Sequence, residues 1–206
     1  VNNQAIQLSG DITVANSFTS SANSQLNGVN AGGVIQSVSG NNTWSGAITQ
    51  VSGNSLNIGA DAGATLNITG TWTSANSATL GGGGTINLQS VLPAYNTFNV
   101  FGGFGGGQTT VNLTTDSSAA FTPPVNLRNT AFVVSGAGKT GGTGLVTVTG
   151  GSSLTLDDTA AAVANRLNNR ALTLEAGANF IYKNNGSSAS SEISTGALTL
   201  NSGGQT

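Results

Sequence analysis

The sequence predicts an all-β fold, a parallel β-helix (β-solenoid) whose coils hold roughly 20 to 26 residues each. Three observations indicate it. Short triplets of apolar, polar and apolar residues recur along the 206 residues. Turn-forming residues separate the triplets, and 31 residues are glycine. The C-terminal third aligns with itself, without a gap, at the spacing that separates residues 146–148 from residues 172–174. Such alternation is typical of strands with one buried face, and such a repeat is typical of stacked coils.

The composition excludes several classes of protein. Charged residues make up only 6% of the chain, and it contains no cysteine, methionine or histidine. Disordered linkers lack the recurrent Val, Leu and Ile of this sequence, so we expect a folded chain. The missing residue types remove disulfides, thiolate nucleophiles, imidazole bases and the usual zinc ligands. We therefore expect a protein that is not an enzyme, with no catalytic residue, no cofactor and no metal site.

The charge pattern bears on partners and location. The net charge is −2 and basic residues form no cluster, which argues against binding to nucleic acid. No run of about 20 apolar residues is present, so we expect no membrane insertion by this segment. A nearly uncharged chain rich in Asn, Thr and Gly suits a secreted protein that stays outside the cell or on its surface. The chain begins at Val1, and we expect that a targeting signal has been removed or lies outside it.

Residues 1–90 are expected to form irregular β-helix coils. Their triplets are spaced by about 8 to 20 residues, so the coils should differ in length and carry loops. Asn or Thr occupies the middle, outward position of most triplets, which predicts a polar ladder on the surface of the solenoid. These triplets are residues 6–8, 12–14, 56–58, 66–68 and 86–88.

Residues 91–124 interrupt the pattern with aromatic residues and a glycine tract, and we expect a loop or an irregular coil. Tyr95, Phe101 and Phe104 lie here. The aromatic residues either fill the core or protrude to contact a ligand or partner, so these three are the candidate contact residues. Trp44, Trp72 and Tyr95 are a candidate sugar-stacking platform, although the strand-like context of the tryptophans favours a place in the core.

Residues 125–206 are expected to form a regular β-helix with 26-residue repeats, continuous with the preceding coils. In this frame residues 146–148, 172–174 and 198–200 coincide, and residues 154–156 coincide with 180–182. The frame ends within a repeat. We therefore expect a fragment of a longer chain, or a subunit whose open end is completed by a neighbour.

The carboxylates of this region have two interpretations. Asp157, Asp158 and Glu175 are close enough in sequence to suggest a glycosidase pair or a calcium-assisted lyase. The repeat frame favours a structural role, because it places Asp157 over Lys183 and Arg166 over Glu192. Opposite charges one rung apart would fix the register of the coils.

The C-terminal repeats resemble the autotransporter-associated β-strand repeats of bacterial surface proteins. The matching residues are 154–159, 165–167, 171–174, 180–182, 192–193 and 196–204, and the Trp-centred stretch 42–49 is similar to a strand of the same class. The resemblance covers about 70 residues well. It implies a right-handed parallel β-helix presented outside the cell as part of a passenger region.

These observations favour a structural or adhesive surface module, a rigid β-helical rod or fibre component of a secreted bacterial passenger protein. Its expected partners are copies of itself, neighbouring repeats of the same chain, and glycans or a host or cell surface. The alternative is a β-helix protein that binds or degrades polysaccharide.

Overall fold

The computed structural model describes residues 6–20, 34–51, 55–73, 76–103, 107–186, 192 and 196–201. Twenty strands and no helix occur in this part of the chain. It accordingly contains no helix long and apolar enough to cross a membrane. Every pairing between named strands is parallel, which requires the chain to travel around a full coil between partners.

The strands form three parallel sheets, one for each side of the coil. Sheet A contains β1 (Ile6–Ser9), β4 (Ile35–Ser39), β7 (Leu56–Ala60), β10 (Ala78–Gly81), β12 (Phe98–Phe101), β14 (Val125–Arg128), β16 (Val146–Val148), β18 (Leu172–Leu174) and β20 (Leu198–Leu200). Sheet B contains β2 (Thr13–Val14), β5 (Asn41–Trp44), β8 (Thr65–Ile68), β11 (Thr85–Leu88), β13 (Thr109–Leu113), β15 (Thr130–Ser135), β17 (Ser153–Asp157) and β19 (Asn179–Lys183). Sheet C contains β3 (Phe18–Ser20), β6 (Ile48–Gln50) and β9 (Trp72–Thr73).

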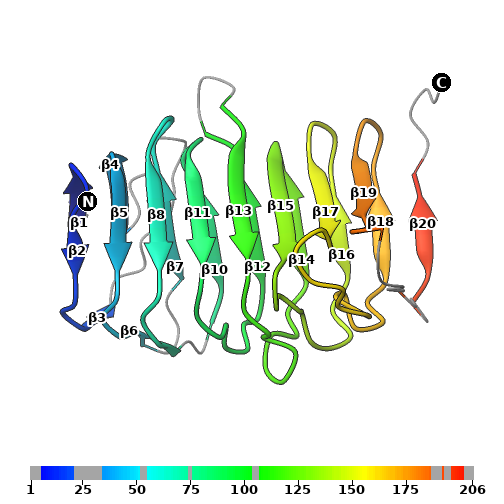
Figure 1. Ribbon diagram of the computed structural model, residues 1–206, viewed down its shortest axis with the longest axis horizontal. Helices are drawn as coiled ribbons and strands as arrows, with labels where there is room; N and C mark the ends of the chain where they lie inside the picture. The colour runs from blue at the N-terminus through cyan, green and yellow to red at the C-terminus, as the bar shows by residue number, and fades with distance from the viewer. Residues whose placement is uncertain are drawn as a thin grey trace.

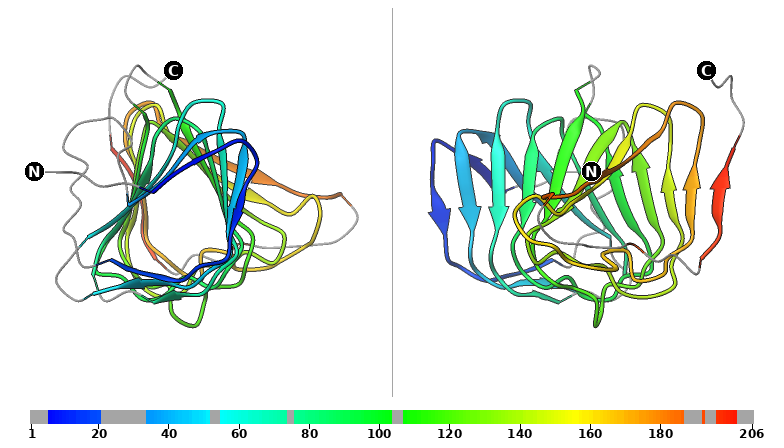
Figure 2. Two further views of the ribbon diagram at one scale, coloured as in Figure 1. Left: turned by 90° about the vertical axis from the view of Figure 1, so that its left-hand side faces the viewer. Right: turned by 45° about the vertical axis from the view of Figure 1, so that its right-hand side comes forward.

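The coils wind as a right-handed solenoid. In Figure 1 the chain advances from left to right while the strands of sheet B, in front, run downward and those of sheet A return behind them. Seen along the axis, the coils superpose around one common core (Figure 2). The predicted fold class, an all-β right-handed parallel β-helix, is confirmed.

The coils differ in length from one end of the chain to the other. Partner residues are 30 apart between β2 and β5, as for Thr13 and Thr43, and 20 apart between β10 and β12, as for Ala78 and Phe98. From β16 onward the separation is constant, since Val146 pairs with Leu172 and Leu172 with Leu198. The 26-residue repeat predicted from residue 125 is wrong for its first coil, because Val125 pairs with Val146, 21 residues further on. The first coil is therefore longer than the predicted range, and the last coils keep the 26-residue spacing.

Residues 91–124, expected as a loop or an irregular coil, contribute a coil to the stack. Strand β12 pairs with β10 and β14, and β13 pairs with β11 and β15. Phe98 and Val100 point into the core while Asn99 points out. This alternation is that of a strand with one buried face, so β12 pairs with its neighbours in sheet A although glycines follow it.

The interior is a single apolar cluster that runs through the described coils. One part of it is aromatic: the ring centroids of Phe98 and Phe121 are 4.9 Å apart in an edge-to-face contact. Phe132 adds a third ring, 6.5 Å from Phe98. Each fully buried side chain of this size contributes roughly 1.5–3 kcal/mol, so this cluster is the main source of stability.

Two stacked glycines set the corner between sheets B and C. A Cβ atom on Gly70 would collide with the carbonyl oxygen of Gly46, and one on Gly46 would collide with the carbonyl oxygen of Asn16. Backbones of successive coils approach this closely because the chain turns sharply at the same place in each coil. Glycine is required where no side chain fits between the turns.

The outward positions carry the predicted polar ladder. On sheet B the Asn87 side-chain amide donates to Asn67 at 2.7 Å, and the Asn112 amide donates to Asn87 at 2.7 Å. On sheet A the Asn126 amide donates to Asn99 at 2.9 Å. Each ladder joins the side chains of residues that are also partners in the backbone register. A shift of register would therefore break the side-chain hydrogen bonds together with the backbone hydrogen bonds.

Sheet C ends at β9, and irregular loops form the third side of the later coils. These loops stack through backbone hydrogen bonds, for example from Ser117 N–H to the Lys139 carbonyl and from Thr140 N–H to the Arg166 carbonyl. The third side is therefore the least regular side of the solenoid. Its loops contain two fully buried arginines, Arg166 and Arg170.

Candidate functional site

Arg166 is fully buried in the loops of the third side. Its Nε donates to Asp158 Oδ1 at 2.5 Å, and both side chains are 0% exposed. Its remaining donors reach the carbonyl oxygens of Gly138 at 2.7 Å and Gly136 at 3.0 Å. Because guanidinium presents five N–H groups in a fixed fork, one side chain joins two loops of the third side.

Arg170 performs a similar role later in the same loop, just before β18. It donates to the carbonyl oxygens of Pro123 at 2.6 Å and Phe121 at 2.5 Å. Its guanidinium lies 5.3 Å from the centroid of the Phe121 ring, within the range of a cation–π contact. Burial lowers the pKa of Arg170 to about 10, so the group remains charged at neutral pH. Both arginines are bound to protein groups and serve the packing of the loops.

The first of the two predicted charge pairs lies on the outer surface. Asp157 pairs in register with Lys183, and Asp157 Oδ2 is 3.5 Å from Lys183 Nζ. The Lys183 side chain is 51% exposed, so solvent screens the attraction. Hydrogen bonds from Thr159 lower the pKa of Asp157, and the nearby Lys183 charge acts in the same direction.

The second predicted pair needs a correction. Glu192 does lie one coil from Arg166, but its carboxylate accepts from the backbone N–H groups of Arg166 at 2.7 Å and Leu167 at 2.8 Å. The guanidinium turns inward instead, because Asp158 and the loop carbonyls offer it a buried and complete set of acceptors. Burial raises the pKa of Glu192.

Tyr95 was predicted as a contact for a ligand or partner, and the structure contradicts this. The side chain is 6% exposed and packs among core rings, 5.7 Å from Phe98 and 6.2 Å from Phe121 between centroids. Burial raises the pKa of its phenol. The segment before β12 carries Tyr95, and it places the ring in the core beside Phe98 and Phe121.

Phe101 lies at an outward position of β12 and is half-buried. The guanidinium carbon of Arg128, on the neighbouring strand β14, is 5.5 Å from the centroid of its ring. This pair is accessible on the surface of sheet A. Phe104, the third candidate contact, lies outside the described residues.

The tryptophans do not form a sugar-stacking platform. Trp44 is 2% exposed and makes an edge-to-face contact with Phe18 at 5.2 Å, and Trp72 is also buried. Both side chains belong to the core cluster. The interpretation that the tryptophans fill the core is confirmed.

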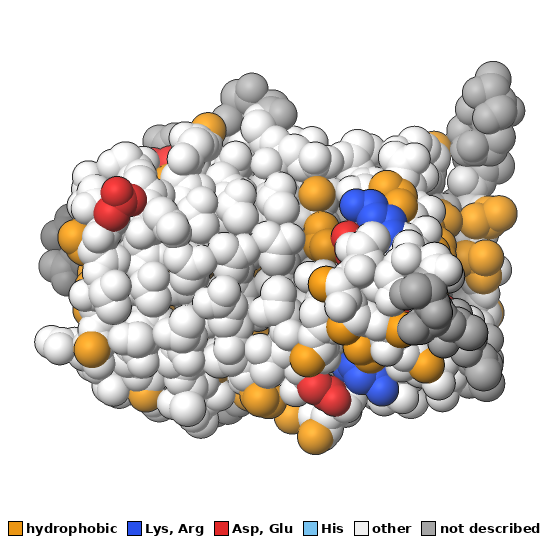
Figure 3. All heavy atoms as spheres, viewed as in Figure 1, with side chains coloured by type: hydrophobic (Ala, Val, Ile, Leu, Met, Phe, Trp, Pro, Cys, Tyr) orange, Lys and Arg blue, Asp and Glu red, His pale blue; other side chains and the backbone are white. Residues whose placement is uncertain are grey.

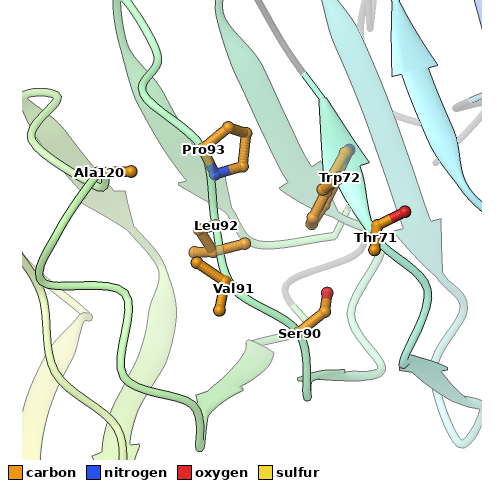
Figure 4. Close-up of a pocket in the computed structure, with 7 residues that line it drawn as sticks. All are labelled: Thr71, Trp72, Ser90, Val91, Leu92, Pro93 and Ala120. Carbon is orange, nitrogen blue, oxygen red and sulfur yellow. The ribbon is translucent and has the colours of Figure 1, made fainter.

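A pocket of about 270 Å³ opens on the third side, where sheet C ends (Figure 4). Trp72 and Thr71 form one wall, and the strand-free segment of the next coil forms the other. The lining residues are Thr71, Trp72, Ser90, Val91, Leu92, Pro93 and Ala120. No titratable side chain lines the pocket, so it can hold an apolar group but supplies no acid or base.

Asp158, one member of the suggested carboxylate pair, is buried against Arg166 and accepts a hydrogen bond from the Tyr182 hydroxyl at 2.9 Å. In the described ranges there is no group of three or more residues of the metal-binding types. The arrangement favours packing and surface contact over bond-breaking chemistry.

Comparison with known proteins adds no assignment. The sequence matches no family model, and neither a curated protein nor a solved structure matches the chain. The resemblance to autotransporter-associated repeats therefore stays a prediction. Sequence reasoning missed the Arg166–Asp158 pair and the pocket beside Trp72, since both depend on loops whose path no motif in the sequence indicates.

Proposed function

We propose that this chain is a structural and adhesive module that acts outside the cell, as a rigid β-helical rod or fibre component of a secreted bacterial passenger protein. The observation that carries the proposal is the unbroken parallel ladder, in which sheet A alone joins nine strands. A continuous ladder over one apolar core resists bending, because every coil is hydrogen-bonded to the next.

The side-chain chemistry supports a role without catalysis. Buried arginines hold the loops, and the ionisable groups of the described coils lie in structural contacts or apart from one another. Exposed polar ladders cover the sheets, which keeps a long regular surface soluble without many charges. In a rod of this kind, function resides in what the surface contacts.

The last described coil supports association along the axis. Leu198 and Leu200 of β20 are 62% and 70% exposed, although the matching positions one coil earlier face the core. A second copy stacked on β20 would cover them. An uncovered strand edge with apolar side chains favours such pairing.

Electron microscopy of the purified chain at increasing concentration tests this proposal. We expect straight rods at low concentration and end-to-end filaments, with a rise set by whole coils, at high concentration. Beads coated with the chain should adhere to bacterial or host-cell surfaces, whereas beads coated with unfolded chain should not. Irregular particles without a long axis, or coated beads that do not adhere, would contradict the proposal.

Glycan binding without turnover is the second candidate. It is favoured by the apolar pocket beside Trp72 and by the accessible ring of Phe101. A glycan array would test it, with Phe101→Ala as the variant. Binding that survives this substitution, and survives Val91→Asp in the pocket wall, would contradict both proposed locations.

A further inference from the structure

The outer face of sheet B repeats one Thr-x-Asn pattern on three consecutive coils. Strands β8, β11 and β13 each turn their Leu, Ile or Val side chains inward and one Thr and one Asn outward. The register places the threonines opposite one another and the asparagines opposite one another. We call this set of side chains the Thr/Asn face: Thr65, Asn67, Thr85, Asn87, Thr110 and Asn112.

The Thr/Asn face is a flat and uncharged grid. Neighbouring strands lie about 4.8 Å apart, and alternate residues along a strand lie about 6.6 Å apart. Figure 3 shows the surface over β8, β11 and β13 without charged or apolar patches. The described pocket lies elsewhere, on the third side beside Trp72. None of the six side chains of the Thr/Asn face is charged.

The grid is held rigidly. The side-chain amides of Asn67, Asn87 and Asn112 are joined by hydrogen bonds of 2.7 Å, in addition to the backbone ladder beneath them. Binding through a surface that is already ordered loses little side-chain entropy. Asn87 and Asn112 each donate one hydrogen bond to the neighbouring asparagine, which leaves each amide a second N–H for a partner outside the chain. The Asn67 amide donates instead to acceptors of the preceding coil.

The ladder accounts for the asparagines but not for the threonines. The hydroxyls of Thr65, Thr85 and Thr110 make no hydrogen bond to any described residue. They stand half-buried in a row beside the amides, each with a methyl group. The face therefore offers unused donors, acceptors and methyl groups at fixed intervals, to which water can hydrogen-bond.

Three observations limit the partner. A charged partner would lose hydration without finding a counter-charge. A sugar would find no aromatic ring at the outward positions of β8, β11 and β13 on which to stack. A flat, uncharged lattice that both donates and accepts hydrogen bonds fits, and ordered water is such a lattice. We propose that the Thr/Asn face binds ice, an activity that does not depend on the structural role proposed above.

The test is the effect of the full chain on ice growth. Recrystallisation of fine-grained ice and the gap between melting and freezing points are measured with increasing protein, and labelled protein is followed onto a single ice crystal. Thr85→Tyr places a bulky ring at the centre of the face. Thr147→Tyr is the matched control. Thr147 is also a half-buried, outward-facing threonine, but it lies in the middle of β16 in sheet A, away from the Thr/Asn face.

We expect the natural chain and Thr147→Tyr to slow recrystallisation equally. Thr85→Tyr should need about tenfold more protein for the same effect, which corresponds to about 1.4 kcal/mol, with an unchanged circular dichroism spectrum. Thr110→Lys should cause a similar loss, because a strongly hydrated ammonium does not fit an uncharged lattice; it serves as the second variant if Thr85→Tyr does not fold.

Two results would overturn the proposal. One is a natural chain that neither slows recrystallisation nor coats the crystal. The other is retention of chain by insoluble cellulose or chitin that Thr85→Tyr abolishes, while ice growth is the same with and without protein. That result would assign the face to a crystalline neutral polysaccharide.

Discussion

Replacement of Arg166 by alanine removes the side chain that joins Asp158 to the carbonyl oxygens of Gly136 and Gly138. Asp158 would stay buried with the Tyr182 hydroxyl but without its cation. Breaking a buried ion pair from one side costs about 3–5 kcal/mol. The same estimate includes the hydrogen bonds that the carbonyl oxygens of Gly136 and Gly138 lose, because water can replace the missing donors at these oxygens.

Urea unfolding followed by circular dichroism measures the effect, with the slope against urea as a check that the cooperative unit is unchanged. Lys183→Ala is the control, because the Lys183 side chain is half exposed and its pair with the partly exposed Asp157 lies at the surface. It should cost about 0–1 kcal/mol. A loss below about 1 kcal/mol for Arg166→Ala, or equal losses for both variants, would refute the reasoning that burial makes this pair essential.

Four further predictions follow from the same contacts. Phe98→Ala should lower the free energy of unfolding by about 3–5 kcal/mol in a urea titration, because it opens a cavity among core rings. Asn87→Ala should cost about 1–3 kcal/mol in the same assay, through its two ladder bonds. Asp157→Asn should destabilise the chain above pH 3.8, and the difference from the natural chain should disappear as the pH falls through the lowered pKa of Asp157, because only the ionised carboxyl is favoured by folding. Tryptophan emission should be blue-shifted and resist quenching by acrylamide, since Trp44 and Trp72 are buried; emission typical of exposed indole would contradict their placement.

The regular C-terminal coils could be predicted residue by residue. The frame that aligned residues 154–156 with 180–182 is the observed pairing of Leu154 with Phe180 and Leu156 with Tyr182. Strict alternation and equal coil length make this possible, because one register then satisfies the core and the polar ladder together. The N-terminal coils lack equal lengths, so their strands could be expected but not their partners.

The parts that the sequence did not reveal depend on contacts between distant loops. The sequence left open whether Tyr95 fills the core or protrudes, and the ring lies beside Phe121, which the chain reaches only after another coil. Arg166 has an acidic residue at the matching place in the next repeat, but its charged partner is Asp158 of its own loop. Periodicity locates strands and says little about side chains in the loops between them.

Distances between spin labels test the stacked rod most directly, and the absence of cysteine allows labels to be placed freely. Asn41 and Ser153 lie in one outward row of sheet B, linked through Thr65, Thr85, Thr110 and Ala131. Five rungs of about 4.8 Å separate the backbones of Asn41→Cys and Ser153→Cys by about 24 Å. A narrow distribution near this value, widened only by the labels, is the predicted result. A broad distribution centred near 60 Å, the span of a flexible chain of this length at about 5–6 Å × √n, would contradict the stacked rod.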